Sequence, residues 1–105
     1  MRVLVVGASG TIGRAVVAEL RERHEIVAAG RSSGEVRLDI ADTASIRAAF
    51  AAAGPIDAVV SAAGKVKFAP FAEMADTDYR IGLADKLMGQ VNLVLIGRDY
   101  VSDGG

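Results

Sequence analysis

The sequence has no cysteine, no tryptophan, only two prolines and a single histidine among its 105 residues. The absence of cysteine excludes disulfide bonds and thiolate chemistry and leaves the redox compartment open. His24 stands alone among arginines and glutamates, so no metal site is expected. No apolar run approaches membrane-spanning length. No signal peptide is expected either, because the apolar start runs directly into glycines.

The sequence also has no large excess of positive or negative charge. Twelve Lys and Arg residues balance thirteen Asp and Glu residues, which leaves a net charge of −1. We therefore expect neither a nucleic-acid surface nor a site for anionic membranes. The length allows one domain, residues 1–105, with a modest core. With 51% hydrophobic residues, the composition is that of a soluble globular protein, and a cytoplasmic location is the default expectation.

What the chain does have is glycine, placed just after an apolar start. Residues 3–6, VLVV, form the unbroken apolar run typical of a strand buried on both faces of a parallel sheet. Gly7, Gly10 and Gly13 follow, and an apolar stripe at helical spacing begins there. In such a turn Gly7 permits a sharp bend, Gly10 a close approach to a pyrophosphate, and Gly13 the packing of helix on strand.

The residues between the glycines complete a candidate phosphate site. Ser9 and Thr11 supply hydroxyl donors, and Ile12 starts the helical stripe. The N-terminus of the helix adds unpaired N–H groups and a partial positive charge. An ordinary strand-to-helix turn that needs glycine is the alternative interpretation.

The segment 6–13, VGASGTIG, resembles the cofactor loop of the short-chain dehydrogenase/reductase superfamily. Its three-glycine spacing is closer to the extended and atypical members than to the classical ones. The resemblance implies an α/β, Rossmann-like, doubly wound parallel sheet that binds NAD(P), with strand order 3-2-1-4. The pattern of the chain places the strands at 3–6, 25–30, 35–39 and 56–61.

The helices follow from periodicity and end signals. We expect the first over residues 11–23 and a second that is capped by Asp42 or Thr43 and stopped by Gly54-Pro55. A long third helix should be capped by Asp76 or Thr77.

The long helix is expected to carry two apolar faces. The main stripe at helical spacing comprises Leu83, Leu87, Val91, Val94 and Leu95, and a second apolar face comprises Ile81, Met88 and Ile96. Residues 91–96 also have the composition of a strand. Helix is favoured by length and by the cap.

The end of the second strand carries the specificity signal. In this fold that position meets the adenosine ribose, where an acidic residue suits NAD and an arginine suits the 2′-phosphate of NADP. Arg31 and Ser32 follow the strand directly, with no acidic residue beside them. The guanidinium fork matches a phosphate, so NADP is favoured over NAD. A merely solvated arginine is the alternative.

Asp39 and Ile40 resemble the acidic-apolar pair that lines the adenine pocket in this family; an aspartate in an ordinary loop is the alternative. Ala62, Ala63 and Gly64 correspond to part of the family's Asn-Asn-Ala-Gly segment, and they imply a backbone that the nicotinamide-side ribose approaches closely. Because the asparagines are missing, we expect the usual polar brace of the sheet to be lost.

Residues 65–71, KVKFAPF, should form a loop. In relatives the corresponding loop leads to the substrate. A hydrophobic loop rim is the alternative.

The catalytic signature of the family, Tyr-x-x-x-Lys with an upstream serine, is not found. Tyr79 is followed four residues later by Leu83, and Tyr100 by Gly104. No catalytic residue is therefore assigned. The resemblance covers about the first half of the family's usual domain, so the chain is expected to be the cofactor half, cut before the fifth strand and incapable of turnover alone.

Two other interpretations remain open: a non-catalytic nucleotide-binding or sensing module, and a half-domain that assembles with a complementary chain. A fourth strand without a neighbour is an apolar edge that invites pairing. We expect a homo-oligomer that forms through this edge or through the long helix.

Overall fold

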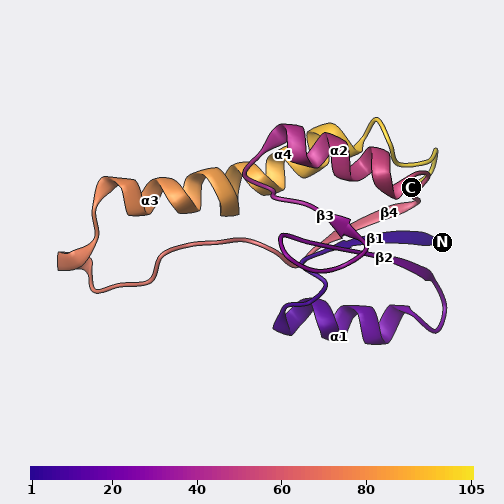
Figure 1. Cartoon of the computed structure of the whole chain (residues 1–105), viewed down its shortest axis with the longest axis horizontal. Helices are drawn as coiled ribbons and strands as arrows, with labels where there is room; N and C mark the ends of the chain where they lie inside the picture. The colour runs from indigo at the N-terminus through magenta and orange to yellow at the C-terminus, as the bar shows by residue number, and fades with distance from the viewer.

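The computed structural model describes all 105 residues and shows a four-stranded parallel sheet between helices (Figure 1). The strands lie in the order β3-β2-β1-β4, which confirms the predicted order. Their bounds are β1 (Arg2–Val6), β2 (Glu25–Gly30), β3 (Val36–Arg37) and β4 (Ala58–Ser61). The helices are α1 (Thr11–Leu20), α2 (Thr43–Ala53), η1 (Phe71–Glu73), α3 (Asp76–Gly82), η2 (Leu83–Leu87) and α4 (Met88–Gly97). No helix is both long enough and apolar enough to cross a lipid bilayer.

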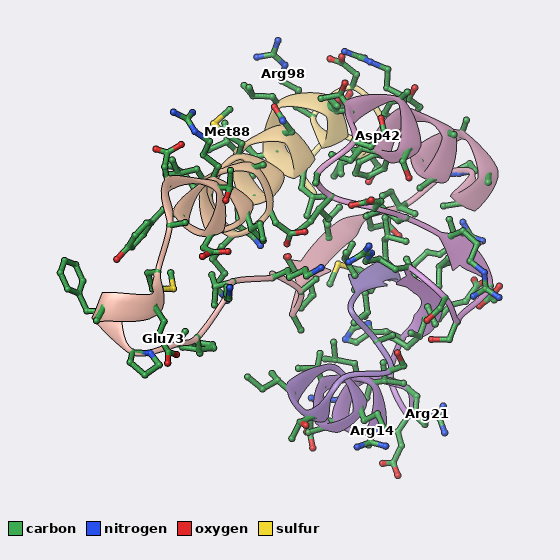
Figure 2. The ribbon with its side chains drawn as sticks, turned by 60° about the vertical axis from the view of Figure 1, so that its left-hand side comes forward. Arg14, Arg21, Asp42, Glu73, Met88 and Arg98 are labelled. Carbon is green, nitrogen blue, oxygen red and sulfur yellow. The ribbon has the colours of Figure 1, made fainter.

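The sheet is covered on both faces, as a doubly wound fold requires (Figure 1). Because side chains alternate along a strand, Val3 and Val5 pack against α1, and Leu4 and Val6 join the larger cluster under α2 and α4. Figure 2 shows the two layers from another side, with Arg14 on α1 and Arg98 after α4 on opposite sides of the sheet. The larger core therefore lies on the α2–α4 side.

Three elements are shorter than the sequence pattern predicted. The first helix ends at Leu20 and continues only as turns. The third strand has two residues in place of residues 35–39. The fourth strand starts at residue 58, not 56, because Ile56 makes only a single parallel bridge, with Val101. A hydrophobic pattern indicates which residues are buried but not where strand pairing begins. Ile56 is buried although it lies outside the paired part of the strand.

The ends of α2 confirm the predicted signals. The carboxylate of Asp42 accepts the N–H of Ala44 at 2.9 Å, which is an N-cap bond. Gly54 ends the helix with φ +73°, the left-handed region that favours glycine.

The long helix departs from the prediction in its cap. Its N-cap is Ala75, in place of Asp76 or Thr77, and the carboxylate of Asp78 accepts the Ala75 N–H at 2.9 Å. This bond and Lys67, whose ammonium lies 3.1 Å from Asp78, hold the pKa of the Asp78 carboxyl below its usual value. The residue that stabilises the helix start therefore lies inside the helix.

The predicted stripe of the long helix, Leu83 to Leu95, faces away from the core. Val94 is 72% exposed, and the other stripe residues are also exposed. The buried side is formed by Leu93 and Ile96 together with two glycines, so Ile96 does not belong to an outer face. At Gly97 an added Cβ would stand 2.8 Å from the Phe50 ring. The side of the long helix that packs on the core is therefore defined partly by glycines, which contribute little to a hydrophobic pattern.

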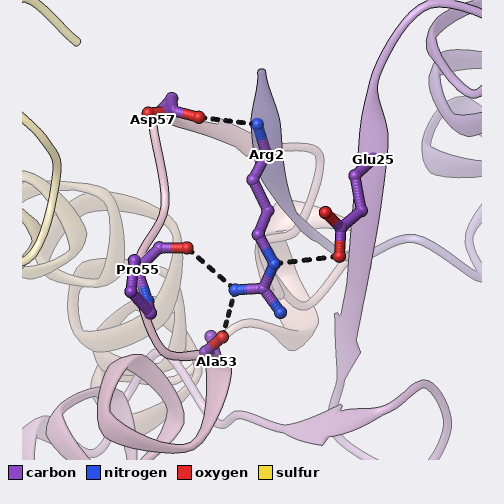
Figure 3. A network of polar contacts seen from close by, with 5 residues as sticks. All are labelled: Arg2, Glu25, Ala53, Pro55 and Asp57. Carbon is purple, nitrogen blue, oxygen red and sulfur yellow. Dashed lines mark hydrogen bonds and ion pairs between the residues drawn. The ribbon is translucent and has the colours of Figure 1, made fainter.

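A polar network fixes the amino ends of the strands (Figure 3). The Arg2 N–H donates to Asp57 Oδ2 at 2.7 Å, and Arg2 Nε donates to Glu25 at 3.1 Å. The same guanidinium donates to the carbonyls of Ala53 and Pro55. β1 is thus tied to β2 and to the connection between α2 and β4, at the end of the sheet opposite the glycine turn.

The network predicts an acid-sensitive stabilisation. The Arg2 N–H and the Ser102 hydroxyl hold the pKa of Asp57 below its ordinary 3.8. Ionised Asp57 therefore stabilises the fold fully above pH 3.8, and this stabilisation is lost as the pH falls through the lowered pKa. We expect Asp57→Asn to lower the melting temperature at neutral pH and to converge with the wild type in acid, as measured by circular dichroism. The exposed Asp103→Asn is the control, and an Asp57→Asn deficit that does not change with pH contradicts this account.

Candidate functional site

The glycine turn brings three backbones into contact. Gly7 has φ +82°, and its N–H donates to the Ala29 carbonyl at 2.8 Å. A Cβ at Gly7 would stand 2.8 Å from the backbone of Ala62, after β4, and a Cβ at Gly13 would overlap the Gly7 carbonyl oxygen. These two positions therefore accept only glycine without displacement of the backbone.

Gly10 serves a different purpose. Its φ is −73°, an ordinary value, and a Cβ there would meet only the Gly7 oxygen, at 3.4 Å. Arg14 is the first residue of α1 whose N–H is bonded within the chain, to Gly10 at 2.9 Å. The amides of residues 11–13 are therefore available at the helix N-terminus, beside a position that has no side chain to cover them.

A groove of about 490 Å³ runs along the carboxyl ends of β2, β1 and β4. Its volume lies in the range of small-molecule sites. It is lined by Val6, Gly7, Ser9, Gly10, Gly30, Arg31, Ser32, Leu38, Ile40, Ala62, Ala63, Gly64, Lys65, Val66, Phe68 and Asp85. Most of the residues predicted for the cofactor site are brought together here.

Four predicted residues do not line this groove: Thr11, Ile12, Gly13 and Asp39. Gly13 is buried beneath the turn, and Ile12 is 69% exposed. Thr11 and Ile12 are exposed at the N-terminus of α1, so the Thr11 hydroxyl and the backbone amides there remain candidates for ligand contact.

The predicted adenine pair is divided between two places. Asp39 lies in a smaller adjacent groove of about 240 Å³ that also includes Arg31, and its carboxylate accepts the Ala41 N–H at 3.0 Å. Ile40 lines the main groove and packs in the core against Gly89. Asp39 therefore shapes its own loop, and Ile40 forms part of the groove floor.

The β2 end of the groove carries the polar residues. Arg31 and Ser32 are exposed and line the groove just after β2. Ser33 Oγ donates to Ser9 Oγ at 2.9 Å, so this loop is fastened to the glycine turn.

At the β4 end, the segment 62–65 is braced by polar contacts. Gln90 Nε2 donates to the Ala63 carbonyl at 2.9 Å, and Asp85 accepts the Lys65 N–H at 2.6 Å. The asparagines of the usual brace are missing, as expected from the sequence. The long helix supplies different polar contacts to this segment.

Four further groove residues are Lys65, Val66, Phe68 and Asp85. Sequence reasoning placed the first three only in a loop that leads to the substrate in relatives, and it missed Asp85. The first three begin the exposed arm between β4 and α3 (Figure 1), and Phe68 is 92% exposed. Asp85 gave no local signal, because its role depends on a helix that approaches from 20 residues away.

These features fit a dinucleotide: an open glycine loop at a helix N-terminus, with a groove to either side of it. The sequence model for the NAD-dependent epimerase/dehydratase family matches residues 3–99. The chain belongs to this family.

The solved structures that resemble the chain include short-chain dehydrogenases, which confirms the resemblance seen in the sequence. The protein lin1944 from Listeria innocua is 42% identical with a TM-score of 0.96, covering 100% of this chain and 52% of its own. A small-chain dehydrogenase in complex with NADPH is 25% identical with a TM-score of 0.86, covering 100% and 48%. A Serratia marcescens short-chain dehydrogenase/reductase mutant is 26% identical with a TM-score of 0.80, covering 99% and 53%.

One curated relative is much longer. The highly reducing polyketide synthase 19 of Pyricularia oryzae is 41% identical over 99 residues, which are 90% of this chain and 4% of that protein. The chain thus spans about half the length of the similar structures and a small part of this relative. Membership of this family identifies the chain as a nucleotide-binding, Rossmann-like domain.

The glycine geometry predicts losses of stability of different size at Gly13 and Gly10. Gly13→Ala forces a methyl group into the Gly7 carbonyl and should lower the free energy of unfolding by about 2 kcal/mol. Gly10→Ala, the matched control, places its methyl group 3.4 Å from the Gly7 carbonyl oxygen, an ordinary van der Waals contact, and should cost less than about 1 kcal/mol. Urea denaturation followed by circular dichroism measures both. Equal losses would mean that the close approach at Gly13 is not a packing constraint.

Proposed function

We propose that this chain binds NADP(H), in preference to NAD(H), along the groove at the carboxyl ends of the strands. The observation that carries the proposal is the position of Arg31 and Ser32, which line the groove directly after β2. The two carboxylates in these grooves, Asp39 and Asp85, accept the N–H groups of Ala41 and Lys65, and the residues next to Arg31 in the sequence are not acidic. A guanidinium fork there matches the 2′-phosphate of NADP, whereas NAD calls for a carboxylate that accepts its 2′-hydroxyl.

Each part of the groove then has a role. The amides of residues 11–13 and the Ser9 hydroxyl bind the pyrophosphate at the N-terminus of α1. Ile40 contacts the adenosine side. The segment Ala62 to Gly64 offers its backbone to the nicotinamide-side ribose, where the absence of large side chains permits close approach.

The bound dinucleotide supplies hydride transfer between its nicotinamide and a carbonyl or alcohol group. Residues 1–105 contain no Tyr-x-x-x-Lys, so we propose that the chain alone binds the dinucleotide without turnover and so acts as a cofactor half or as a sensing module. A second possibility is a half-domain that assembles with a complementary chain. It is favoured by a groove of about 460 Å³ beside β4, which is lined in part by Val59, Leu93 and Val94. A complementary chain would then complete the sheet, and its co-purification would test this. A cytoplasmic location is proposed for either form.

Calorimetric titration with NADP⁺ and with NAD⁺ tests the cofactor preference. We expect Arg31→Asp to weaken NADP⁺ binding about 10- to 100-fold, because a hydrogen bond to a charged group contributes about 1.5–3 kcal/mol. NAD⁺ binding should be retained or improved. Arg21→Asp makes the same charge change at the far end of α1 (Figure 2) and should alter neither affinity. If Arg31→Asp and Arg21→Asp behave alike, the specificity assignment fails.

We further propose that two copies of the chain associate through the outward stripe of the long helix. The outward side of the long helix carries a solvent-exposed apolar row, formed by Leu83, Leu87, Val91, Val94 and Leu95. Single exposed apolar residues are normal on a protein surface, but a contiguous row of this kind indicates an interaction site. A two-fold axis would pair this row with itself.

Sedimentation velocity tests this association. We expect the wild type to dimerise and the double variant Leu87→Glu/Val94→Glu to be a monomer, because paired carboxylates would be buried at the contact. Ala51→Glu, on the exposed side of α2, should leave the dimer intact. If the double variant still dimerises, the interface is the β4 edge and not the long helix. If the wild type is a monomer, both interfaces are contradicted.

A further inference from the structure

The long helix is interrupted at the level of the groove. Between α3 and α4 the five residues of η2, Leu83–Leu87, form a π-turn. A π-turn adds a residue to the helical turn and is found frequently at functional sites. The one charged side chain that is buried in this protein, Asp85 at 6% exposure, lies inside this turn.

Two side chains from this helix hold the backbone on either side of Gly64. Asp85 Oδ1 accepts the Lys65 N–H at 2.6 Å, and Gln90 Nε2 donates to the Ala63 carbonyl at 2.9 Å. Gly64 itself has φ +147°, and the Lys86 side chain packs over it, 2.5 Å from where a Cβ would stand. The long helix thus contacts this segment at three consecutive residues, Ala63, Gly64 and Lys65.

The π-turn is what allows both hydrogen bonds. In a regular α-helix, two residues that are five positions apart point about 140° away from each other. The wider turn reduces this angle, so Asp85 and Gln90 reach the same short segment. A buried carboxylate costs desolvation free energy, and here the cost is offset by a short, charge-assisted bond.

The gripped segment lies at one end of the groove. Arg31 follows β2, Gly64 follows β4, and the glycine turn after β1 lies between them. A dinucleotide whose pyrophosphate rests on the glycine turn therefore places one nucleoside at the β2 end and the other at the β4 end. With the 2′-phosphate at Arg31, the β4 end receives the nicotinamide half.

We propose that Asp85 and Gln90 are positioning residues that fix the 63–65 backbone against the nicotinamide half of the dinucleotide. The inference rests on the proposed function, since it takes the groove to be the NADP site. It assigns no role to these residues in binding the adenosine half.

Two ligands separate the halves of the site. NADP⁺ occupies both ends, whereas adenosine 2′,5′-bisphosphate carries the 2′-phosphate but lacks the nicotinamide half. We expect Gln90→Met and Asp85→Ala each to raise the Kd for NADP⁺ about fivefold, the effect of one lost hydrogen bond. The Kd for the bisphosphate should stay within about twofold of the wild type. Asp85→Asn, which keeps an acceptor oxygen, should restore part of the NADP⁺ affinity. Asp99→Asn, an exposed carboxylate after α4, should change neither Kd.

A measurement without ligand guards against variants that merely fold poorly. Asp85→Ala should accelerate hydrogen exchange of the Lys65 amide about tenfold or more, because that N–H loses its acceptor. Amides in β1 should keep their protection. Faster exchange throughout the sheet would show a general loss of stability and would overturn the positioning role.

The other outcomes are also decisive. Equal weakening of both ligands, or no change in either, overturns the inference and leaves the NADP site standing. A wild type that binds neither ligand overturns the proposed function and this inference with it.

Discussion

The structure depends on the contact of four elements at Gly7. Its N–H donates to the Ala29 carbonyl of β2, its Cα lies against the backbone after β4, and its carbonyl lies under Gly13 of α1. A methyl group at either glycine would separate the helix or the fourth strand from the end of β1. The groove exists because these backbones meet without side chains, and the helix N-terminus is brought to the same point. Packing and anion recognition therefore have one geometric cause.

A chain with net charge −1 is an unpromising host for a polyanion if surface potential is considered alone. The groove solves this locally. Its donors are backbone amides, hydroxyls, the guanidinium of Arg31 and the ammonium of Lys65. The loop that carries Arg31 is tied to the glycine turn by Ser33 and Ser9. Such preorganised dipoles do not depend on net charge. The absence of a basic surface is thus compatible with phosphate binding.

The glycine turn and the cap at Asp42 were predictable because each depends on residues adjacent in sequence. The strand order, which joins distant segments, was predictable only through the family resemblance. The orientation of the long helix was not. Hydrophobic periodicity selected Leu83 to Leu95, yet the inner side is set by glycine at position 97, which admits the Phe50 ring. The brace from Gln90 to Ala63 also escaped prediction, because it joins segments 27 residues apart. Pattern reveals which residues are apolar, but complementary shape decides which of them are buried.

The long helix has three sides with different surroundings, and this constrains how it can change. Leu93 and Ile96 anchor it to the core, Asp85 and Gln90 bond to the end of β4, and the stripe around Val94 faces solvent. In a regular helix, Asp85 and Gln90 would diverge by about 140°, so the core and groove contacts could not both be kept by a straight, uninterrupted element. The π-turn reconciles them by adding one residue between the exposed arm and the buried end of the helix. Its position follows from geometry: it must lie where the helix passes from solvent onto the sheet, beside the strand end that it supports.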